Sequence, residues 1–187
     1  MTVTLIGGLA HALVETVVVR QVGLDDFSEA RYLHAKALSA QTADALSDDE
    51  ISAFVALANS AAYADVLRQE EIYGAFIDGQ LVGTASWQVN NDDGKVVRIS
   101  SVFVHPMFWR YGIGRRLVAE VEARAMHSGF DQFSVSTTFN AVPFFEKVGY
   151  QVSSRGVRSF GPACALPVAF LRKVVVRQVR TPVPATA

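Results

Sequence analysis

Two apolar runs joined by Asp78-Gly79 constrain the fold of this chain more than any other feature. The runs, IYGAFI and LVGTASWQV, are rich in residues that favour strands. An Asp-Gly pair between such runs predicts a two-residue turn, because glycine readily adopts the positive φ that the turn needs. NNDDG (90–94) predicts a second turn, and KVVRISSVFV (95–104) predicts a third strand. The centre of the chain is therefore expected to form a three-stranded antiparallel meander.

The chain before this meander predicts one strand and two helices. Residues 17–22 are β-branched and short, which is typical of a strand. Asp25 and Asp26 are candidate N-caps of the first helix, and Ser47 with Glu50 forms a capping-box pattern at the start of the second. The expected core positions are Phe27, Ala30, Leu33 and Ala37 in the first helix, and Ile51, Phe54, Val55 and Ala58 in the second.

Helical periodicity returns after Pro106. A helix is expected from near Gly112 to Ser128-Gly129, with Glu120 and Arg124 spaced as an i,i+4 ion pair. Its apolar face carries Leu117, Val118, Val121 and Ala125, and its opposite, solvent-facing side carries Arg115, Arg116, Glu120, Glu122 and Arg124.

A strand at 130–137 follows this helix and is expected to lie parallel to 95–104, because a helical crossover connects the two. A short helix at 141–148 and strands at 150–157 and 166–176 complete an α+β fold on one sheet. We expect an N-terminal arm (1–16), a single domain (17–176) and a C-terminal tail (177–187).

Composition excludes several function classes. A net charge of −1 without a large basic block argues against nucleic-acid binding. The one cysteine, Cys164, excludes an internal disulfide, does not make a zinc site by itself, and fits a reducing, cytoplasmic setting. We expect it to be a buried, inert thiol. His11 and Glu15 interrupt the apolar N-terminus before it reaches membrane-spanning length, so no membrane association is expected.

HPMFWRYGIGRRL (105–117) places Gly112 and Gly114 at the start of the third helix. Helix N-termini bind anions through free N–H groups, and glycine lets a phosphate oxygen approach them closely. The pair therefore indicates a phosphate or pyrophosphate site, although a tight loop for helix packing explains it about as well. A dinucleotide fingerprint would need glycine at Leu117, and a P-loop would need lysine at Arg115.

VFVHPMFWRYGIGRRLV (102–118) and NAVPFFEKVGY (140–150) resemble the two signature segments of the GNAT superfamily of acyl-CoA-dependent N-acyltransferases. The first is similar to the pyrophosphate motif of that family, and the second to its Asn-Ala and Gly-Tyr segment. The predicted order of elements over 17–176 also resembles that family. The resemblance implies a mixed, mostly antiparallel central sheet with helices on both faces.

The resemblance further implies that acetyl-CoA is the acyl donor and that no metal is needed. The strand at 102–104 would separate from its neighbour and bind the pantetheine arm, residues 109–115 would wrap the pyrophosphate, and Asn140 and Phe144 would contact the pantetheine end. The implied coenzyme-binding residues are Val102, Phe103, Val104, Trp109, Arg110, Tyr111, Gly112, Ile113, Gly114, Arg115, Asn140 and Phe144.

The sequence departs from the family pattern at three places. Trp109 stands where the family has Arg or Gln, and backbone N–H groups are expected to compensate. Phe145 replaces the tyrosine that serves many relatives as the acid, leaving Tyr111 or Tyr150 as substitutes at other positions. The strand 96–104 has no carboxylate. The candidates for a base are therefore a water relay oriented by Ser100 or Ser101, or else His34; His11, His105 and His127 are expected to be structural or at the surface.

The leading hypothesis is an N-acetyltransferase in which a primary amine attacks acetyl-CoA directly in a ternary complex. Strand N–H groups near Val104 would stabilise the oxyanion. The alternatives are an acyl-CoA-binding module without catalysis and a nucleotide-binding regulator. The acceptor stays open among peptide N-termini, lysine, polyamines, amino acids and drug amines. It is expected to be selected by the first two helices and by 155–168. A homodimer through the Val-rich terminal strand is also expected.

Overall fold

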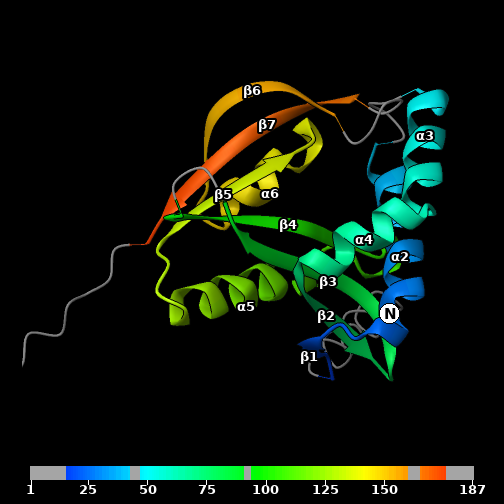
Figure 1. Ribbon diagram of the computed structural model, residues 1–187, viewed down its shortest axis with the longest axis horizontal. Helices are drawn as coiled ribbons and strands as arrows, with labels where there is room; N and C mark the ends of the chain where they lie inside the picture. Colours follow the sequence, from blue (N-terminus) through cyan, green and yellow to red (C-terminus); the bar gives the residue numbers. More distant parts are fainter. Residues whose placement is uncertain (1–15, 43–46, 91–93, 160–164, 176–187) are drawn as a thin grey trace, which may run out of the picture.

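A seven-stranded mixed sheet forms the centre of the fold in the computed structural model, which describes residues 16–42, 47–90, 94–159 and 165–175 (Figure 1). The strand order is β1-β2-β3-β4-β5-β7-β6, and β4 and β5 are the parallel pair in an otherwise antiparallel sheet. The strands are β1 (Val18–Gln21), β2 (Glu71–Ile77), β3 (Gln80–Val89), β4 (Val96–Val104), β5 (Gln132–Thr137), β6 (Gln151–Ser159) and β7 (Ala165–Val174). The predicted α+β fold with a mixed, mostly antiparallel sheet is confirmed.

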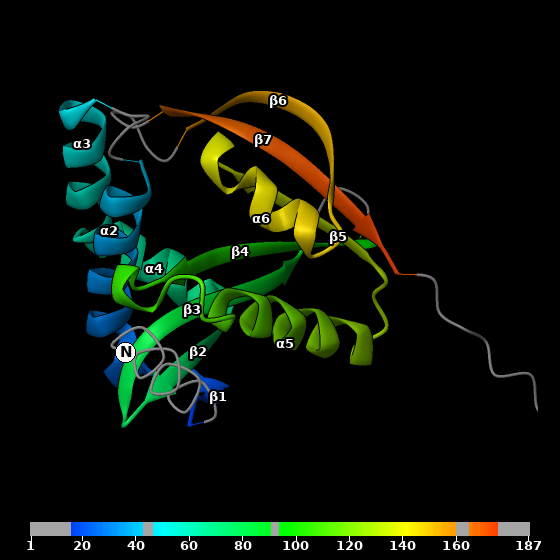
Figure 2. The same ribbon diagram turned by 180° about the vertical axis from the view of Figure 1, so that it is seen from behind.

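The helices cover both faces of this sheet (Figures 1 and 2). They are α2 (Phe27–Thr42), α3 (Asp48–Ala58), α4 (Ala61–Gln69), α5 (Ile113–His127) and α6 (Val142–Lys147), with 3₁₀ turns η1 (Leu24–Asp26), η2 (Pro106–Phe108) and η3 (Phe139–Ala141). One core cluster packs α5 and α6 against one face, and a second packs α2 and α4 against the other. None of the helices in the described part of the chain has the length and apolarity needed to cross a bilayer.

The predicted hairpin is present between β2 and β3. Asp78 and Gly79 both have positive φ, at 49° and 80°, as a tight two-residue turn of this kind requires. Strand β4 then pairs antiparallel with β3, so the three-stranded meander is confirmed.

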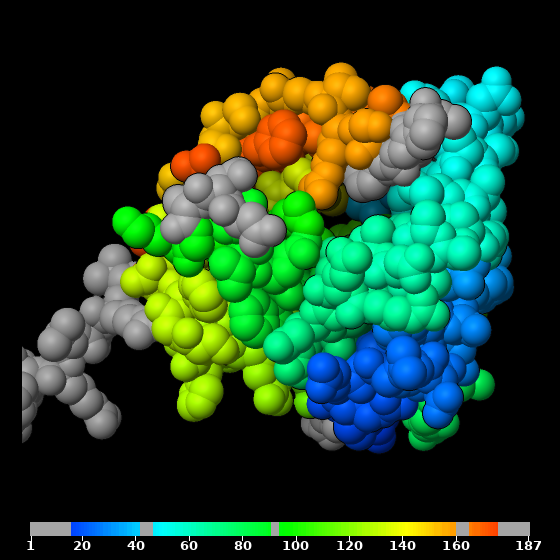
Figure 3. All heavy atoms as spheres, viewed as in Figure 1, coloured from blue at the N-terminus to red at the C-terminus, as the bar shows by residue number. Residues whose placement is uncertain are grey.

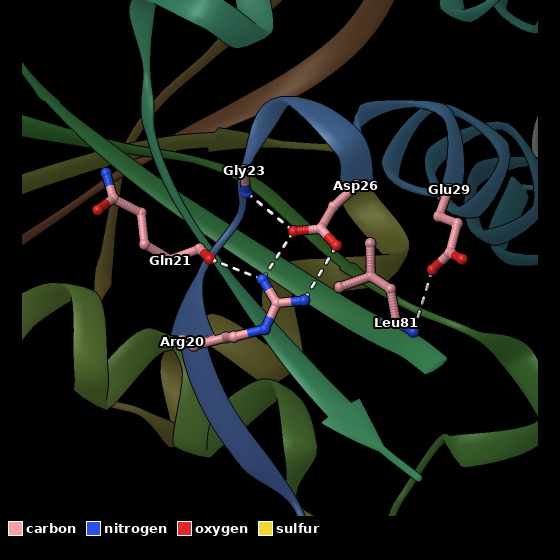
Figure 4. A network of polar contacts seen from close by, with 6 residues as sticks. All are labelled: Arg20, Gln21, Gly23, Asp26, Glu29 and Leu81. Carbon is pink, nitrogen blue, oxygen red and sulfur yellow. Dashed lines mark hydrogen bonds and ion pairs between the residues drawn. The ribbon is translucent and has the colours of Figure 1, made fainter. Parts of the chain in front are cut away.

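The start of α2 is fixed by a charged network rather than by a simple aspartate cap (Figure 4). The Asp26 carboxylate accepts hydrogen bonds from the Arg20 guanidinium at 2.7 and 3.0 Å and from Gly23 N at 2.8 Å. The hydrogen bond from Arg20 lowers the pKa of Asp26. Glu29 accepts from Leu81 N at 3.4 Å, which ties the first turn of α2 to β3. These bonds set the position of a helix that borders the functional site.

Helix α4 was not predicted from the sequence. The capping box of α3 at Ser47 and Glu50 is present, but the helical run does not continue into the meander. Instead the Ser60 side chain accepts from Tyr63 N at 3.2 Å and starts a separate helix. Helix α4 buries Ala64 and Leu67 and ends directly before β2. The end of α4 therefore lies beside the middle strands of the sheet.

Glu122 corrects the prediction that the polar face of α5 is entirely exposed. The residue is buried at 6% exposure, and its carboxylate accepts from the Tyr150 hydroxyl at 2.8 Å and from Lys173 Nζ at 2.7 Å. This ion pair links α5 to β7. The predicted Glu120–Arg124 ion pair is present at 2.8 Å, and α5 ends at Ser128 and Gly129 as expected.

Strand β7 is an inner strand, paired with β5 over residues 169–174 and with β6 over 165–172, so these paired residues do not offer a free edge, and the homodimer stays a prediction. The outer strands of the described sheet are β1 and β6. The predicted arm, except Thr16, and the predicted tail lie outside the described residues, as do His11 and Cys164.

Candidate active site

The parallel strands β4 and β5 pair only over their first residues, the last paired positions being Ile99 and Val135. Beyond this point β5 continues its pairing with β7 to Thr137, while β4 continues beside β3 to Val104. A bulge at this level places Ser101 at a φ of 50° and bends β4. The sheet therefore opens between β4 and β5, as the family resemblance implied for 102–104.

The start of α5 lies at the end of β4 and forms a strongly curved turn. Arg110 and Gly112 both have positive φ, at 70° and 83°. The first backbone bond of the helix runs from Arg116 N to Gly112 O at 3.0 Å. The N–H groups of residues 113–115 precede this bond and therefore point out of the helix end, where the helix dipole favours an anion.

Two different structural reasons favour glycine at positions 112 and 114 of this turn. Gly112 faces open space, and its positive φ is the conformation that disfavours other residues. A Cβ atom on Gly114 would lie 3.3 Å from the Phe144 ring and 3.6 Å from a Val104 methyl group. Gly114 thus lets α5 approach the segment that carries Phe144, so close packing contributes to its presence there.

A cleft of about 950 Å³ passes through the opening between the strands. The hollow is visible between the green surface of β4, the teal surface of α4 and the orange surface of β6 (Figure 3). The predicted coenzyme-binding residues that line it are Val102, Phe103, Val104, Trp109, Arg110, Gly112, Ile113, Gly114, Arg115, Asn140 and Phe144. Tyr111 is 40% exposed and does not line the cleft.

Two of these lining residues are fixed by hydrogen bonds to neighbouring elements. The indole N–H of Trp109, at the position where the family has Arg or Gln, donates to Val104 O at 2.7 Å. Asn140 Nδ2 donates to Gln41 O at 2.6 Å, which links the η3 turn to α2. The side chain of Trp109 therefore fixes the turn to β4 instead of supplying a positive charge.

The carboxylate that strand 96–104 lacks is supplied by Glu70, at the end of α4. Glu70 Oε2 accepts from Ser86 Oγ at 2.6 Å and from Ser101 Oγ at 2.7 Å, and its Oε1 accepts from Ser100 Oγ at 3.0 Å. Glu70 is half-buried and lines the cleft. The serines predicted to orient a water relay therefore hold a carboxylate in place at the bulge of β4.

His34 is a structural residue and not the base. It is fully buried and bonds Tyr63 Oη through Nδ1 and Thr84 Oγ1 through Nε2, both at 2.8 Å. Because the Thr84 hydroxyl donates to Ser101 O, it accepts from His34, which places the histidine proton on Nε2. Burial lowers the pKa of His34 to about 3, so the ring is neutral and connects α2 to the bulge.

The comparison with known families and structures gives one clear assignment. The model of the acetyltransferase (GNAT) family matches residues 39–150, more than half of the chain. The chain belongs to this family. The match includes α4 with Glu70, the meander, the glycine turn and α6.

Curated relatives of this GNAT family member match over part of their length. The Bacillus subtilis protein YdhI is 28% identical over 79 residues, which are 41% of this chain and 46% of YdhI. The Bacillus subtilis N-acetyltransferase YjcF is 31% identical over 91 residues, which are 48% of this chain and 63% of YjcF. The chain therefore matches less than two thirds of the length of either relative.

Solved structures share the fold over most of their length. A GCN5-related N-acetyltransferase from Rhodopseudomonas palustris superposes with a TM-score of 0.75 at 24% identity, covering 86% of this chain and 96% of that one. The PaiA N-acetyltransferase of Thermoplasma acidophilum, solved with coenzyme A, gives 0.65 at 16% identity over 85% and 99%. YncA of Salmonella typhimurium, solved with acetyl-CoA, gives 0.59 at 17% identity over 88% and 97%.

The position of the family tyrosine is filled by a core residue in this GNAT chain. Phe145 is 3% exposed and packs edge-on against Phe144 and Tyr150. Tyr150 is 2% exposed, donates to Glu122, and has its pKa raised by burial, so it does not serve as a proton donor in the cleft. His105 accepts from Met107 N and caps η2, and His127 is exposed. Within the described ranges, no three His, Cys, Asp or Glu residues are grouped as a metal site would need.

The neutral buried state of His34 predicts an acid-sensitive stability. The pKa of His34 is about 3 in the fold and 6.5 in the unfolded chain, so as the pH falls the unfolded chain binds this proton first. This contribution to stability is fully present above pH 6.5 and is lost as the pH falls toward 3, by about 1.4 kcal/mol per unit, or about 2 kcal/mol at pH 5. Urea unfolding at pH 7.5 and 5 measures it.

Variants separate this contribution from other titrating groups. In His34→Gln the stability difference from the wild type should shrink by about 2 kcal/mol between pH 7.5 and pH 5. The exposed His127→Gln is the matched control and should follow the wild-type pH dependence. An equal deficit of His34→Gln at both pH values would contradict the assignment.

Proposed function

We propose that this chain transfers the acetyl group of acetyl-CoA to a primary amine by direct attack in a ternary complex. The single observation that carries the proposal is the cleft through the sheet, which joins the glycine turn of α5 on one side to Glu70 on the other. The family assignment supports acetyl transfer as the reaction class. The coenzyme complexes of PaiA and YncA support coenzyme A as the carrier.

The donor half of the proposal rests on the turn at 109–115. The N–H groups of residues 113–115 would bind the pyrophosphate, and Arg110 and Arg115 would add positive charge beside it. The unpaired edge of β4 beyond Ile99 would bind the pantetheine arm through its backbone and direct the thioester into the gap. Strand N–H groups near Val104 would stabilise the negative charge that develops on the carbonyl oxygen.

The acceptor half rests on Glu70. An alkylamine with a pKa near 10.4 is protonated at pH 7, and releasing the neutral amine costs about 4.6 kcal/mol. The proposed step transfers one ammonium proton to the Glu70 carboxylate and on to solvent. The nitrogen then bonds to the acetyl carbon, the carbon–sulfur bond breaks, and the second nitrogen proton passes to the leaving sulfur or to solvent. A thiol pKa near 8.5 makes release as thiolate cost only about 2 kcal/mol, so the loss of the tyrosine at Phe145 is tolerable.

The phenylalanine at 145 also favours a second candidate, an acyl-CoA-binding module without catalysis. One experiment separates the two. Coenzyme A release from acetyl-CoA is followed with a thiol reagent over a panel of primary amines, and acetyl-CoA binding is measured by calorimetry. Amine-dependent release supports the transferase, whereas tight binding with release on no amine supports the module.

A further inference from the structure

The opening in the sheet is bordered by two strand edges, β4 beyond Ile99 (the β4 lip) and β5 beyond Val135 (the β5 lip). On the same face of the sheet, these two lips carry opposite charges. Val97 and Ile99 of β4, and Val135 of β5, pack in the cluster with α5. Because side chains alternate along a strand, the next residues, Ser100 and Ser136, point to the opposite face. These serines come directly after the last paired positions of β4 and β5, so they stand on either side of the gap.

Each of these serines binds one charged side chain. Ser100 donates to Glu70 at 3.0 Å, so the carboxylate lies on the β4 lip. Ser136 accepts from the Arg158 guanidinium of β6, so a cation lies on the β5 lip. Both Glu70 and Arg158 line the cleft. An acceptor that reaches the thioester from this face passes between them.

The two charges interact with each other. Burial, followed by repulsion from Arg98, lowers the pKa of Arg158, and the nearby Glu70 acts in the opposite direction. A guanidinium stays protonated in proteins and presents N–H donors in a planar fork that fits a carboxylate through two parallel bonds. Arg158 is thus a partly desolvated cation on the acceptor side of the cleft.

The other side chains that line the same part of the cleft as Glu70 and Arg158 indicate which chemical groups the remainder of the acceptor carries. Apolar side chains from α2, α3, α4 and β7 line this side: Leu38, Phe54 and Leu166, which pack together in one buried cluster, and the exposed Val66. Among the described residues that line the cleft, Glu70 is the one acidic side chain. A polyamine would bring several positive charges to a cleft with one carboxylate, so this lining disfavours it.

We propose that the acceptor is an amino acid with an apolar side chain, whose amine binds at Glu70 and whose carboxylate binds Arg158. This inference rests on the proposed acetyl transfer and narrows its acceptor. The apolar side chain would lie against the surface formed by Leu38, Phe54, Val66 and Leu166. Among the acceptor classes open from the sequence, the amino acid is the one whose two charges match both lips of the gap.

The test compares three acceptors of matched shape in the wild-type chain: leucine, leucinamide and 3-methylbutylamine. We expect kcat/KM for leucine to exceed that for 3-methylbutylamine at least tenfold. Leucinamide has the more weakly basic amine, so a larger fraction of it is unprotonated and able to attack at neutral pH. A preference for leucine over leucinamide therefore reports recognition of the carboxylate.

Variants at Arg158 test whether this side chain is the one that recognises the carboxylate of leucine. Arg158→Met should reduce the ratio of kcat/KM for leucine to kcat/KM for 3-methylbutylamine to about one, chiefly by raising the KM for leucine. Arg158→Lys should retain part of this preference because the charge remains. Arg155→Met is the matched control on the same strand: Arg155 lies over the Phe139 ring, outside the cleft lining, and its loss should leave the preference intact.

The outcomes separate this inference from the proposed function. Turnover of all three acceptors without a preference for the carboxylate overturns the inference and leaves the transferase standing. A leucine preference that persists in Arg158→Met also overturns it. If acetyl-CoA binds but no acceptor in the panel releases coenzyme A, the proposed function fails and the inference fails with it. If Arg158→Met does not fold, the wild-type series and Arg158→Lys decide.

Discussion

Glu70→Gln is expected to lower kcat by about 10² to 10⁴, which is the usual contribution of a positioned general base. Glutamine has the shape of glutamate and keeps hydrogen-bonding capacity toward Ser86, Ser100 and Ser101, but it does not accept a proton from the ammonium group. The KM for acetyl-CoA should change little, because Glu70 is proposed to act on the acceptor amine and not on the coenzyme. Steady-state kinetics with the best amine of the panel measures both quantities.

The pH dependence distinguishes loss of the base from a local structural change. The fraction of free amine rises about tenfold per pH unit below the amine pKa, so the activity of Glu70→Gln should rise more steeply from pH 7 to 9 than that of the wild type. Glu71→Gln, at the adjacent exposed position, is the matched control and should keep wild-type kcat. A Glu70→Gln enzyme with unchanged kcat at pH 7 would remove Glu70 from the mechanism.

Replacing both glycines of the turn, as Gly112→Val with Gly114→Val, is expected to weaken acetyl-CoA binding by about 10² to 10⁴. A branched side chain at 112 opposes the φ of 83°, and one at 114 presses on the Phe144 ring at 3.3 Å. The turn then no longer presents its N–H groups to the pyrophosphate. Losing two hydrogen bonds to a charged group, at about 1.5 to 3 kcal/mol each, accounts for this range. Calorimetric titration with acetyl-CoA measures it.

Gly129→Val is the control for this prediction, because Gly129 also has positive φ, at 102°, and lies at the other end of the same helix. It imposes a similar backbone strain away from the cleft, so it should lower the melting temperature without changing affinity for acetyl-CoA. Unchanged affinity in the folded double glycine variant would contradict the pyrophosphate site.

Features that depend on neighbouring residues could be predicted from the sequence. The turn at Asp78-Gly79 follows from backbone conformations that few residues adopt, and the structure has both residues at positive φ. The same holds for Gly112, whose conformation starts α5 where the motif predicted it. The family motifs then indicated the cleft-lining residues around this turn. Local backbone preference and helix periodicity are encoded within a few positions, so one sequence is enough to read them.

The tertiary structure alone decided which charged side chains lie on either side of the opening in the sheet. Glu70 contacts Ser100 from 30 positions away, and Arg158 contacts Ser136 from 22 positions away. Glu122, predicted at the surface, is buried and pairs with Lys173 from 51 positions away. No periodicity specifies such contacts, because they depend on which strands separate, where a bulge turns a side chain and how a helix ends above the sheet. The sequence by itself therefore determined the frame and the glycine turn at the start of α5, and only the packing of distant elements determined which charged side chains line the cleft.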